Sequence, residues 1–338
     1  MNIRMKLTAV LALAATLPVL ADIKINDNLS VNGYGVGSYE YFKQDKSTST
    51  DSLNVDSALL GATISYKPVT AVFSFYYVPN TASGLDVPTG HSGVNQNGDE
   101  VTLLDANVTY DTGSGITMTA GRFLSYMGYE SFYPIHMDQI SYADGDFLAP
   151  IPGYHEGVHI DYSDKSQTAG LALVDSVYSP YGATKGDGEL KHNGGLEAYY
   201  SYVGITNLTL WAGYAYDSKG GFEVHSISTF DFWASYQIDK QTRVAAEYVN
   251  KDGGTGNKGY NWIVFGDYTF AESKFSLAGR ISGEKLSNGG PGFTKYTICP
   301  TYAVTDHLSV RAEYSYYHYT DFTSKDANFF GVQTIFQF

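Results

Sequence analysis

Hydrophobic and polar residues alternate along most of the chain, in segments that end in an aromatic residue. In the last segment, Phe330, Val332 and Phe336 alternate with small or polar residues up to the terminal Phe338. Earlier segments end in a tyrosine that is followed by a short polar turn: Tyr66, Tyr110, Tyr162, Tyr202, Tyr236, Tyr268 and Tyr302. Successive side chains of a strand point to opposite faces, and an aromatic residue at one height on every second strand is typical of a membrane-interface girdle. The pattern predicts an all-β fold, a transmembrane antiparallel up-and-down β-barrel.

Counting back in twos from each tyrosine gives the residues that we expect to face lipid. The row that ends at Tyr110, for example, contains Leu104. Pro300 also falls on a lipid-facing row, and because proline cannot donate a ladder hydrogen bond we expect a bulge there. Arg122 has lipid-facing parity too. Arginine at mid-membrane is costly, so Arg122 is expected either at the outer rim or turned inward by a bulge.

Short and long connections alternate between these segments. The short ones lie at residues 67–68, 111–114, 163–166, 204–206, 239–241, 271–273 and 304–306. The long ones span 43–51, 80–99, 125–153, 179–190, 218–224, 252–258, 284–292 and 320–327. They predict about 16 strands, within a range of about 14 to 18, with short turns in the periplasm and long loops outside. A barrel of this width leaves an aqueous channel.

The first 21 residues have the pattern of a secretory signal peptide. Arg4 and Lys6 provide a positive start, an apolar stretch follows, and Ala21 ends a small-residue cleavage site. We therefore expect residues 1–21 to be removed and residues 22–338 to form the barrel. No later stretch approaches the roughly 18 apolar residues that a membrane-spanning helix needs. An exported chain with this alternation is predicted in the outer membrane of a Gram-negative bacterium.

Composition agrees with a barrel and disfavours other classes. The mean hydropathy of −0.19 fits a wall in which only every second residue meets lipid. The net charge of −14 argues against nucleic acid as a partner, because phosphate binding needs concentrated basic charge. The single cysteine, Cys299, rules out an internal disulfide framework. The eight histidines show no ligand spacing, so neither a metal site nor another cofactor is predicted.

The face opposite the aromatic rows carries charged residues, which must face water. If loop 125–153 folds inward, its acids would face a basic wall formed by the C-terminal segments and set up a transverse field across a narrowed pore. The alternative interpretation is that these pairs only compensate one another's charge. The candidate pore-lining and constriction residues are Arg122, Glu130, Asp138, Asp144, Asp146, Arg243, Asp267, Arg280, Lys295, Arg311 and Glu313.

Three short segments resemble the OmpL-like outer-membrane β-barrel porins. Gly121-Arg122-Phe123 resembles that family's strand ending in glycine, a basic residue and phenylalanine, and Gly128-Tyr129-Glu130 resembles its following loop. His155-Glu156-Gly157-Val158 is similar to the opening of the family's next strand. The resemblance implies a pore-forming function of unknown solute and allows a homotrimer. Phe338 in turn resembles the C-terminal aromatic signal that bacterial barrel-assembly machinery recognises.

The favoured function is therefore a porin, a passive diffusion channel for small hydrophilic solutes that is embedded in outer-membrane lipid. A substrate-specific channel, for instance for sugars, is a close alternative. Tyr199, Trp211 and Trp233 have inward parity and are the candidate aromatic track, although such residues more often serve packing.

An enzyme and a surface adhesin are weaker alternatives. His155, His159 and Asp161 share inward parity on one strand, but residues two apart lie roughly 7 Å apart, so we expect no direct contact between them. No Gly-x-Ser-x-Gly element occurs in the sequence. An adhesin would use the long loops at 80–99 and 125–153, which are more typical of variable surface.

Overall fold

The computed structural model describes residues 22–78, 100–130, 133–143, 148, 151–178, 194–218, 226–254, 258–287, 289–320 and 326–338. Its main feature is a sheet that closes on itself: β2 to β17 form a 16-stranded antiparallel up-and-down barrel, which confirms the predicted fold class. The short strand β1 (Ile23–Asn26) pairs with the start of β2. The barrel strands are β2 (Leu29–Gln44), β3 (Thr50–Tyr66), β4 (Val69–Val78), β5 (Glu100–Asp111), β6 (Ile116–Leu124), β7 (Tyr154–Ser163), β8 (Gln167–Val174), β9 (Gly195–Ile205), β10 (Leu208–Asp217), β11 (Ile227–Gln237), β12 (Thr242–Asp252), β13 (Lys258–Thr269), β14 (Phe275–Leu286), β15 (Gly292–Ala303), β16 (Leu308–Thr320) and β17 (Asp326–Gln337).

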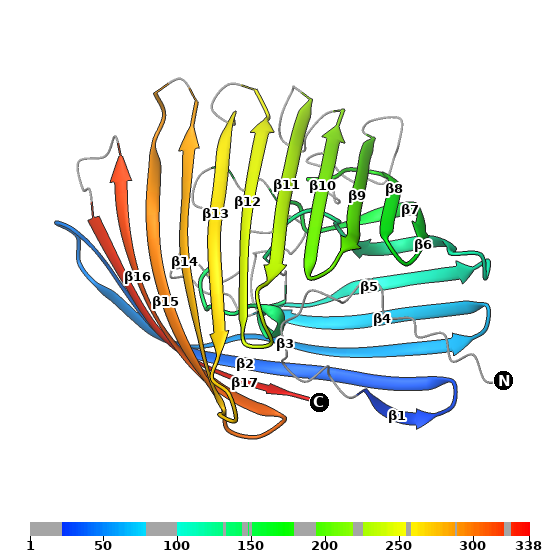
Figure 1. Ribbon diagram of the computed structural model, residues 1–338, viewed down its shortest axis with the longest axis horizontal. Coiled ribbons are helices and arrows are strands. Elements are labelled where there is room, and N and C mark those ends of the chain that lie inside the picture. Colours follow the sequence, from blue (N-terminus) through cyan, green and yellow to red (C-terminus); the bar gives the residue numbers. More distant parts are fainter. Residues whose placement is uncertain are drawn as a thin grey trace.

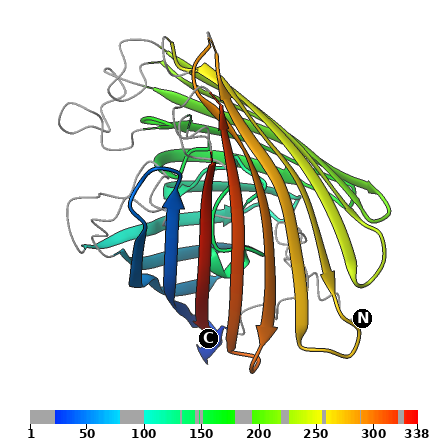
Figure 2. The same ribbon diagram turned by 90° about the vertical axis from the view of Figure 1, so that its left-hand side faces the viewer.

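Each barrel strand pairs with its neighbours in the chain, and β17 closes the ring by pairing with β2. The closing ladder runs from Gln337 opposite Tyr34 to Ala327 opposite Gln44. Figure 2 shows the red strand β17 beside the blue strand β2. In Figure 1, β9 to β14 run steeply and β2 to β5 run nearly horizontally, as tilted strands on different sides of a barrel do. Closure leaves no sheet edge, so the backbone polar groups are satisfied without water.

All seven predicted short connections are tight links between consecutive strands. We call the end of the barrel that carries them the turn end, and the opposite end the loop end. At the turn between β7 and β8, the backbone N–H groups of Ser166 and Gln167 donate to Asp164. These bonds, with further ones from the two side chains, hold the pKa of the Asp164 carboxyl well below its usual range.

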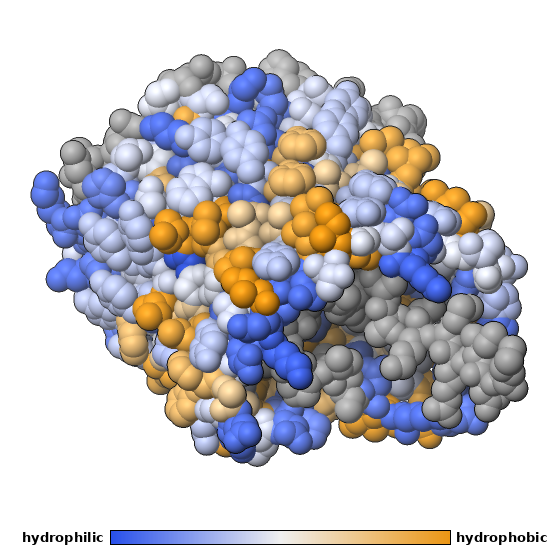
Figure 3. Space-filling view, in the orientation of Figure 1, coloured by the Kyte–Doolittle hydropathy of each residue, from blue (hydrophilic) through white to orange (hydrophobic). Residues whose placement is uncertain are grey.

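The outward face carries the predicted aromatic girdle at the turn end. Tyr66 is 65% exposed and Tyr302 is 38% exposed, and the other girdle tyrosines lie between them except Tyr202, which is half-buried. Phe336 lies outward at the same end of β17, whereas its neighbour Ile335 is buried in the lumen. Figure 3 shows a diagonal band of hydrophobic residues across one face of the molecule, with hydrophilic residues beyond it. The parity deduced from the tyrosines therefore separates outer from inner residues.

The terminal Phe338 is fixed to β2 by backbone bonds in both directions with Gly33, each 2.9 Å long. A Cβ atom at Gly33 would lie 2.6 Å from the Leu59 carbonyl oxygen and 2.8 Å from the Phe338 ring. Position 33 therefore needs glycine, because any side chain would displace the terminal aromatic ring. The C-terminus lies at the turn end, close to the start of the first barrel strand.

The parity fails at a bulge in β5. The ladder with β4 shifts its register between Phe73 and Phe75, so β5 accommodates one extra residue there. Leu104 consequently turns inward and is fully buried, and the prediction that it faces lipid is wrong. Leu103 takes the outward position and is 39% exposed. A bulge re-aims a side chain without interrupting the barrel, and simple counting in twos does not detect it.

Pro300 causes no bulge, and that prediction is also wrong. The ladder between β15 and β14 is continuous through Pro300. The register with β16 is the same on both sides of it, with Ile298 opposite Tyr314 and Thr301 opposite Arg311. The missing N–H is accommodated by a local gap in this one ladder, while the ring stays on the exposed outer face.

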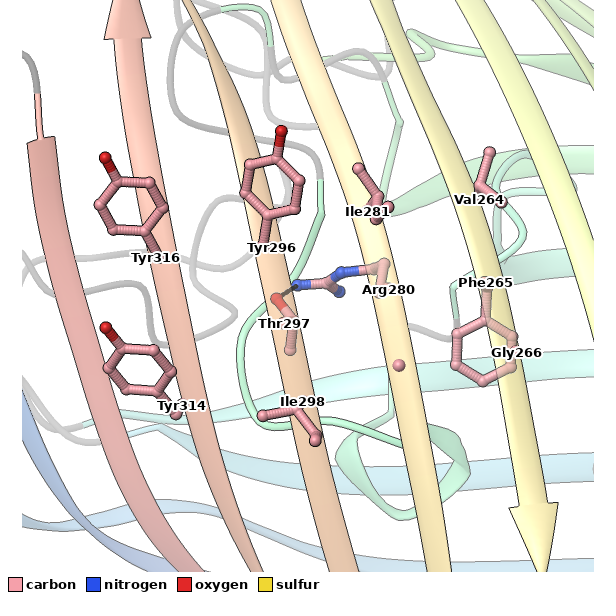
Figure 4. Close-up of a pocket in the computed structure, with 11 residues that line it drawn as sticks. Val264, Phe265, Gly266, Arg280, Ile281, Tyr296, Thr297, Ile298, Tyr314 and Tyr316 are labelled. Carbon is pink, nitrogen blue, oxygen red and sulfur yellow. Dashed lines mark hydrogen bonds between the residues drawn. The ribbon is translucent and has the colours of Figure 1, made fainter.

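A groove with a volume of about 520 Å³ lies in the outer wall across β13 to β16. Gly266 and Gly279 are paired on adjacent strands and leave its floor open. Figure 4 shows Tyr296, Tyr314 and Tyr316 along one side of it. Most side chains around it are on the lipid-facing parity, whereas Phe265, Arg280 and Thr297 are buried on the inner one, so the groove opens on the membrane surface of the barrel.

The assignment of residues to the outer or inner face of a strand predicts how a lysine substitution changes the stability of the barrel. Val264 is 52% exposed on the outer face of β13, and Thr269 lies on the same strand with inner parity near the turn end. We expect Val264→Lys to lower the free energy of unfolding in lipid vesicles by about 2–4 kcal/mol, because lysine near the bilayer midplane is poorly solvated. Thr269→Lys should cost much less. Denaturant titration in vesicles measures both, and equal losses would contradict the assigned parity.

Candidate functional site

Loop L3, residues 125–153, joins β6 to β7 and folds into the barrel, as predicted. Its contacts reach the inner wall on β9, β11, β12, β14, β15 and β16, and so extend from the strands near its attachment to the far side of the ring. Most of these contacts use the backbone of L3 rather than its side chains. The lumen is therefore occupied at the level of the charged wall residues.

Three buried carboxylates on β9, β11 and β12 accept hydrogen bonds from the first residues of L3. The contacts are Ser125 Oγ and Tyr126 N to Glu197 (2.7 and 3.1 Å), Gly128 N to Asp231 (2.8 Å) and Tyr129 N to Glu247 (2.6 Å). Hydrogen bonds to a charged acceptor are roughly twice as strong as neutral ones. The acids thus pin the loop at successive points along the wall.

Charged residues on β15 and β16 hold the middle of L3. The Glu313 carboxylate accepts from the backbone N–H groups of Ile140 (2.6 Å) and Ser141 (3.0 Å) and from the Ser141 hydroxyl. The neighbouring base Arg311 donates to three L3 carbonyl groups, those of Pro134 (2.6 Å), Met137 (2.6 Å) and Gln139 (3.0 Å). Lys295 donates to the carbonyl of Tyr142 at 2.9 Å. Acidic side chains of the wall therefore accept hydrogen bonds from N–H groups of L3, and basic side chains donate to its carbonyl groups.

Two ion pairs join acids of L3 to arginines of the wall. Glu130 pairs with Arg280 on β14, and Asp138 pairs with Arg243 on β12 at 2.6 Å. Arg243 is also 2.6 Å from Asp267 on β13. Figure 4 shows Arg280 reaching across to Thr297 on β15 at 3.4 Å. These acids face the basic wall, as the sequence predicted.

The structure brings together Glu130, Asp138, Arg243, Asp267, Arg280, Lys295, Arg311 and Glu313 from the predicted set. Asp144 and Asp146 lie outside the described residues. Each member of the described group contacts an opposite charge or the L3 backbone, and the side chains are buried except that of Asp138, which is 28% exposed. These contacts support charge compensation as their first role, and their effect on ion selectivity stays a prediction.

Arg122 is separate from this group. It lies two residues before the end of β6, after Gly121, whose φ of 127° is a conformation that favours glycine. Its Nε donates to the Leu104 carbonyl at 3.1 Å, and Nη1 is 3.5 Å from Glu156. Arg122 is 5% exposed, so its charge is sheltered by protein near the rim and is kept away from lipid.

Several residues that hold L3 were not predicted as site residues. Glu284 accepts from the Leu148 N–H at 2.9 Å, and Lys251 donates to the Leu148 carbonyl at 2.9 Å. Asp217 holds the next loop in the same way, by accepting from the N–H of Val177 at 2.9 Å. Their inward parity was visible in the sequence. Their partners are backbone groups, which leave no signal in a sequence.

A short 3₁₀ turn, Pro134–His136, packs part of L3 against β2, β4 and β17. The hydroxyl groups of Tyr133 and Tyr154 meet, and both contact the Asp105 carboxylate. Within the described residues, no helix is long and apolar enough to cross a membrane.

The predicted aromatic track exists as a stack. Trp211 lies between Tyr199 and Trp233, with ring centroids 6.1 and 5.7 Å apart and rings nearly parallel. Tyr126 and Tyr129 of L3 pack against its two ends, at 4.5 Å from Tyr199 and 5.5 Å from Trp233. Both tryptophans are buried, so the central part of the stack serves as a platform under L3.

His159 and Asp161 do make a direct contact, and the prediction that they do not is wrong. His159 Nδ1 is 2.5 Å from Asp161 Oδ2. The Cα spacing along a strand does not limit side chains that lean toward each other. His155 is instead fully buried, with Nε2 3.6 Å from Glu197. Among the hydrogen bonds of the described residues, His159 has no hydroxyl or thiol partner that could act as a nucleophile.

The chain matches the family described as "Putative beta-barrel porin-2, OmpL-like" over residues 19–338. It belongs to this family. The match covers nearly the whole chain and confirms the resemblance seen at residues 121–130 and 155–158. No curated protein matches the chain.

Solved outer-membrane porins have the same fold. OprB of Pseudomonas putida is 10% identical with a TM-score of 0.68, over 92% of this chain and 94% of OprB. An anion-selective porin from Comamonas acidovorans is 12% identical with a TM-score of 0.64, over 92% of this chain and all of the porin. The trimer form of OmpT from Vibrio cholerae is 16% identical with a TM-score of 0.61, over 92% and 100% of the two chains. At these identities the similarity shows the fold, and family and fold together identify a porin-like barrel of the bacterial outer membrane.

The wall contacts predict how L3 responds to loss of one anchor. We expect Glu313→Ala to lower the local opening free energy of residues 137–143 by about 2–3 kcal/mol, because three hydrogen bonds to one buried charge are lost. Amide hydrogen exchange at Ile140 and Ser141 should then accelerate by about 30- to 150-fold. Asp306→Ala, which removes an exposed acid from the β15–β16 turn, is the control. Unchanged exchange in Glu313→Ala would show that this carboxylate does not hold L3.

Proposed function

We propose that the protein is a passive diffusion channel for small hydrophilic solutes. The observation that carries this proposal is a closed 16-stranded barrel with a polar inner wall, across which L3 is anchored from several sides. A barrel of this width cannot be filled by its own wall side chains, so the inserted loop sets the aqueous path. Solutes would pass beside L3, and its position would fix the limiting width.

A channel in the outer membrane has a defined orientation and a set of partners. We infer that the turn end faces the periplasm and the loop end the exterior. Residues 1–21 would direct export and be cleaved, leaving residues 22–338 in outer-membrane lipid. Phe338, fixed beside Gly33 at the turn end, would be the residue that barrel-assembly machinery recognises. The trimer form of OmpT supports a homotrimer as the proposed assembly.

Family and fold favour a channel over an enzyme or an adhesin. The His159–Asp161 pair is an incomplete catalytic arrangement in the described residues, because a base needs a nucleophile within hydrogen-bond reach. Assays of phospholipid and peptide hydrolysis in detergent test this directly. Turnover that is lost in His159→Ala and retained in the wild type would favour the enzyme.

Conductance tests the pore itself. Reconstituted in planar bilayers, the wild-type protein should give discrete conductance steps. A variant that lacks residues 133–143 should give steps about twofold larger or more, because that segment occupies the lumen beside β16 and β2. Equal steps in the two proteins would mean that L3 does not set the width. A folded wild-type protein that never conducts would refute the channel.

Processing tests the predicted signal peptide. Protein purified from outer membranes should begin at Asp22 when its N-terminus is sequenced, because Val19-Leu20-Ala21 fits the small-residue cleavage pattern. Replacing Ala21 with a bulky residue, as in Ala21→Phe, should leave the longer precursor. Mature protein that retains residues 1–21 would contradict the assignment.

A further inference from the structure

The inner wall carries both charged residues and neutral hydroxyl groups. Around L3 the inner wall is rich in acids and bases, and these contact one another or the loop. Toward the turn end, inner-parity positions carry hydroxyl groups that are half-buried and open to water: Thr63, Thr70, Thr109, Thr117, Thr168 and Thr209. Asp161 lies opposite Thr117 in the ladder between β6 and β7, so a carboxylate and neutral hydroxyl groups occur at the same level there.

A polar and aromatic cluster lies on the inner wall beside the first residues of L3. It consists of His159 and Asp161 on β7, Tyr126 of L3 and Tyr199 on β9. Tyr126 donates its hydroxyl to Asp161 Oδ1 at 3.0 Å, and its ring lies 5.6 Å from His159 and 4.5 Å from Tyr199. We call these four residues the vestibule site.

The vestibule site keeps partial access to water, unlike the Arg280–Glu130 pair, whose side chains are 1% and 6% exposed. The His159 side chain is 14% exposed and that of Asp161 is 19% exposed, and both tyrosines are half-buried. A carboxylate offers about four acceptor positions. Tyr126 and His159 account for two of them and Tyr199 interacts with the same carboxylate, so acceptor capacity remains for a hydroxyl group of a bound solute.

Gly170 gives the site its space. It lies on β8 between Asp161 of β7 and Tyr199 of β9, in register with both. A Cβ atom at this position would clash with the Asp161 carboxylate and the Tyr199 ring. The absence of a side chain at position 170 lets the carboxylate and the aromatic face lie next to each other.

We propose that the vestibule site binds a neutral polyhydroxylated solute, such as a monosaccharide or disaccharide. Sugar rings have an apolar face that packs on aromatic rings, and hydroxyl groups that donate to a carboxylate and exchange hydrogen bonds with an imidazole. Tyr199 and Tyr126 supply the aromatic surface, and Asp161 and His159 supply the polar contacts. An anionic solute is disfavoured, because Asp161 would repel it. This inference rests on the proposed channel and names its solute class.

The test measures current and binding separately. In planar bilayers, glucose, maltose and xylitol are added in turn to the turn-end side of the conducting wild-type protein, and each should reduce the current in a saturable way. Equilibrium dialysis of the detergent-folded protein with radiolabelled glucose measures binding without any current. Glucuronate, the charged analogue of glucose, should bind at least about tenfold more weakly.

Variants locate the site. Asp161→Asn and Tyr199→Leu should each weaken glucose binding by about tenfold, whereas Tyr200→Leu, the outward neighbour on β9 that is 46% exposed, should leave it unchanged. The heat-dependent gel shift of folded barrels checks that each variant folds, and Asp161→Asn preserves shape if Tyr199→Leu does not fold.

The outcomes are distinguishable. Absence of conductance in the wild type overturns the channel before any sugar is added. Conductance with neither current reduction nor dialysis binding for the three neutral solutes overturns the vestibule site and leaves the channel standing. Glucuronate binding as tight as glucose, or equal loss in Tyr200→Leu, also overturns it.

Discussion

A carboxylate buried on the inner wall of a barrel needs hydrogen-bond donors, and here the backbone of L3 supplies them. Glu197, Asp231, Glu247 and Glu313 all accept N–H groups from the loop, and Arg311 and Lys295 donate to its carbonyls. An irregular loop inside a membrane barrel has the complementary problem, because its N–H and C=O groups lack regular partners. The charged side chains of the wall and the backbone groups of L3 thus satisfy each other's hydrogen-bonding capacity. The position of L3, and with it the free space in the lumen, depends on this exchange.

This arrangement separates the structural charges from the groups that meet solute. Because the acids and bases are paired and withdrawn from water, their fields are largely cancelled within the wall. The partly exposed groups at the turn end include several threonine hydroxyls, together with Asp161 and His159. A count of lumen charges therefore overestimates the field that a passing ion would experience.

Most of the fold could be predicted from the sequence, because strand parity is a local property. The terminal aromatics marked one end of the strands. The alternation of apolar and polar residues indicated the inner face of each strand, and the short and long connections indicated the number of strands. Parity failed where one residue changes the local geometry, as at Leu104 in the β5 bulge and at Arg122 after Gly121. At Pro300 the opposite happened, because the ladder tolerated a missing donor without a shift of register. The candidate site was less predictable. Its contacts join residues such as Tyr129 and Glu247, far apart in sequence, through backbone groups common to every residue.

The aromatic stack shows how one feature can serve both structure and recognition. Trp211 and Trp233 are covered by L3 and contribute packing, whereas Tyr199 at the end of the stack is half-buried and lies in register with Gly170, beyond which is Asp161. Tyr126 packs on Tyr199 and Tyr129 packs on Trp233, so the stack fixes the first residues of L3 beside the wall acids. The hydroxyl of Tyr126 in turn donates a hydrogen bond to Asp161, so this contact depends on the position of L3. The loop that narrows the lumen and the groups at its open edge are consequently positioned by the same rings, so displacement of L3 would alter the width of the path and the vestibule site together.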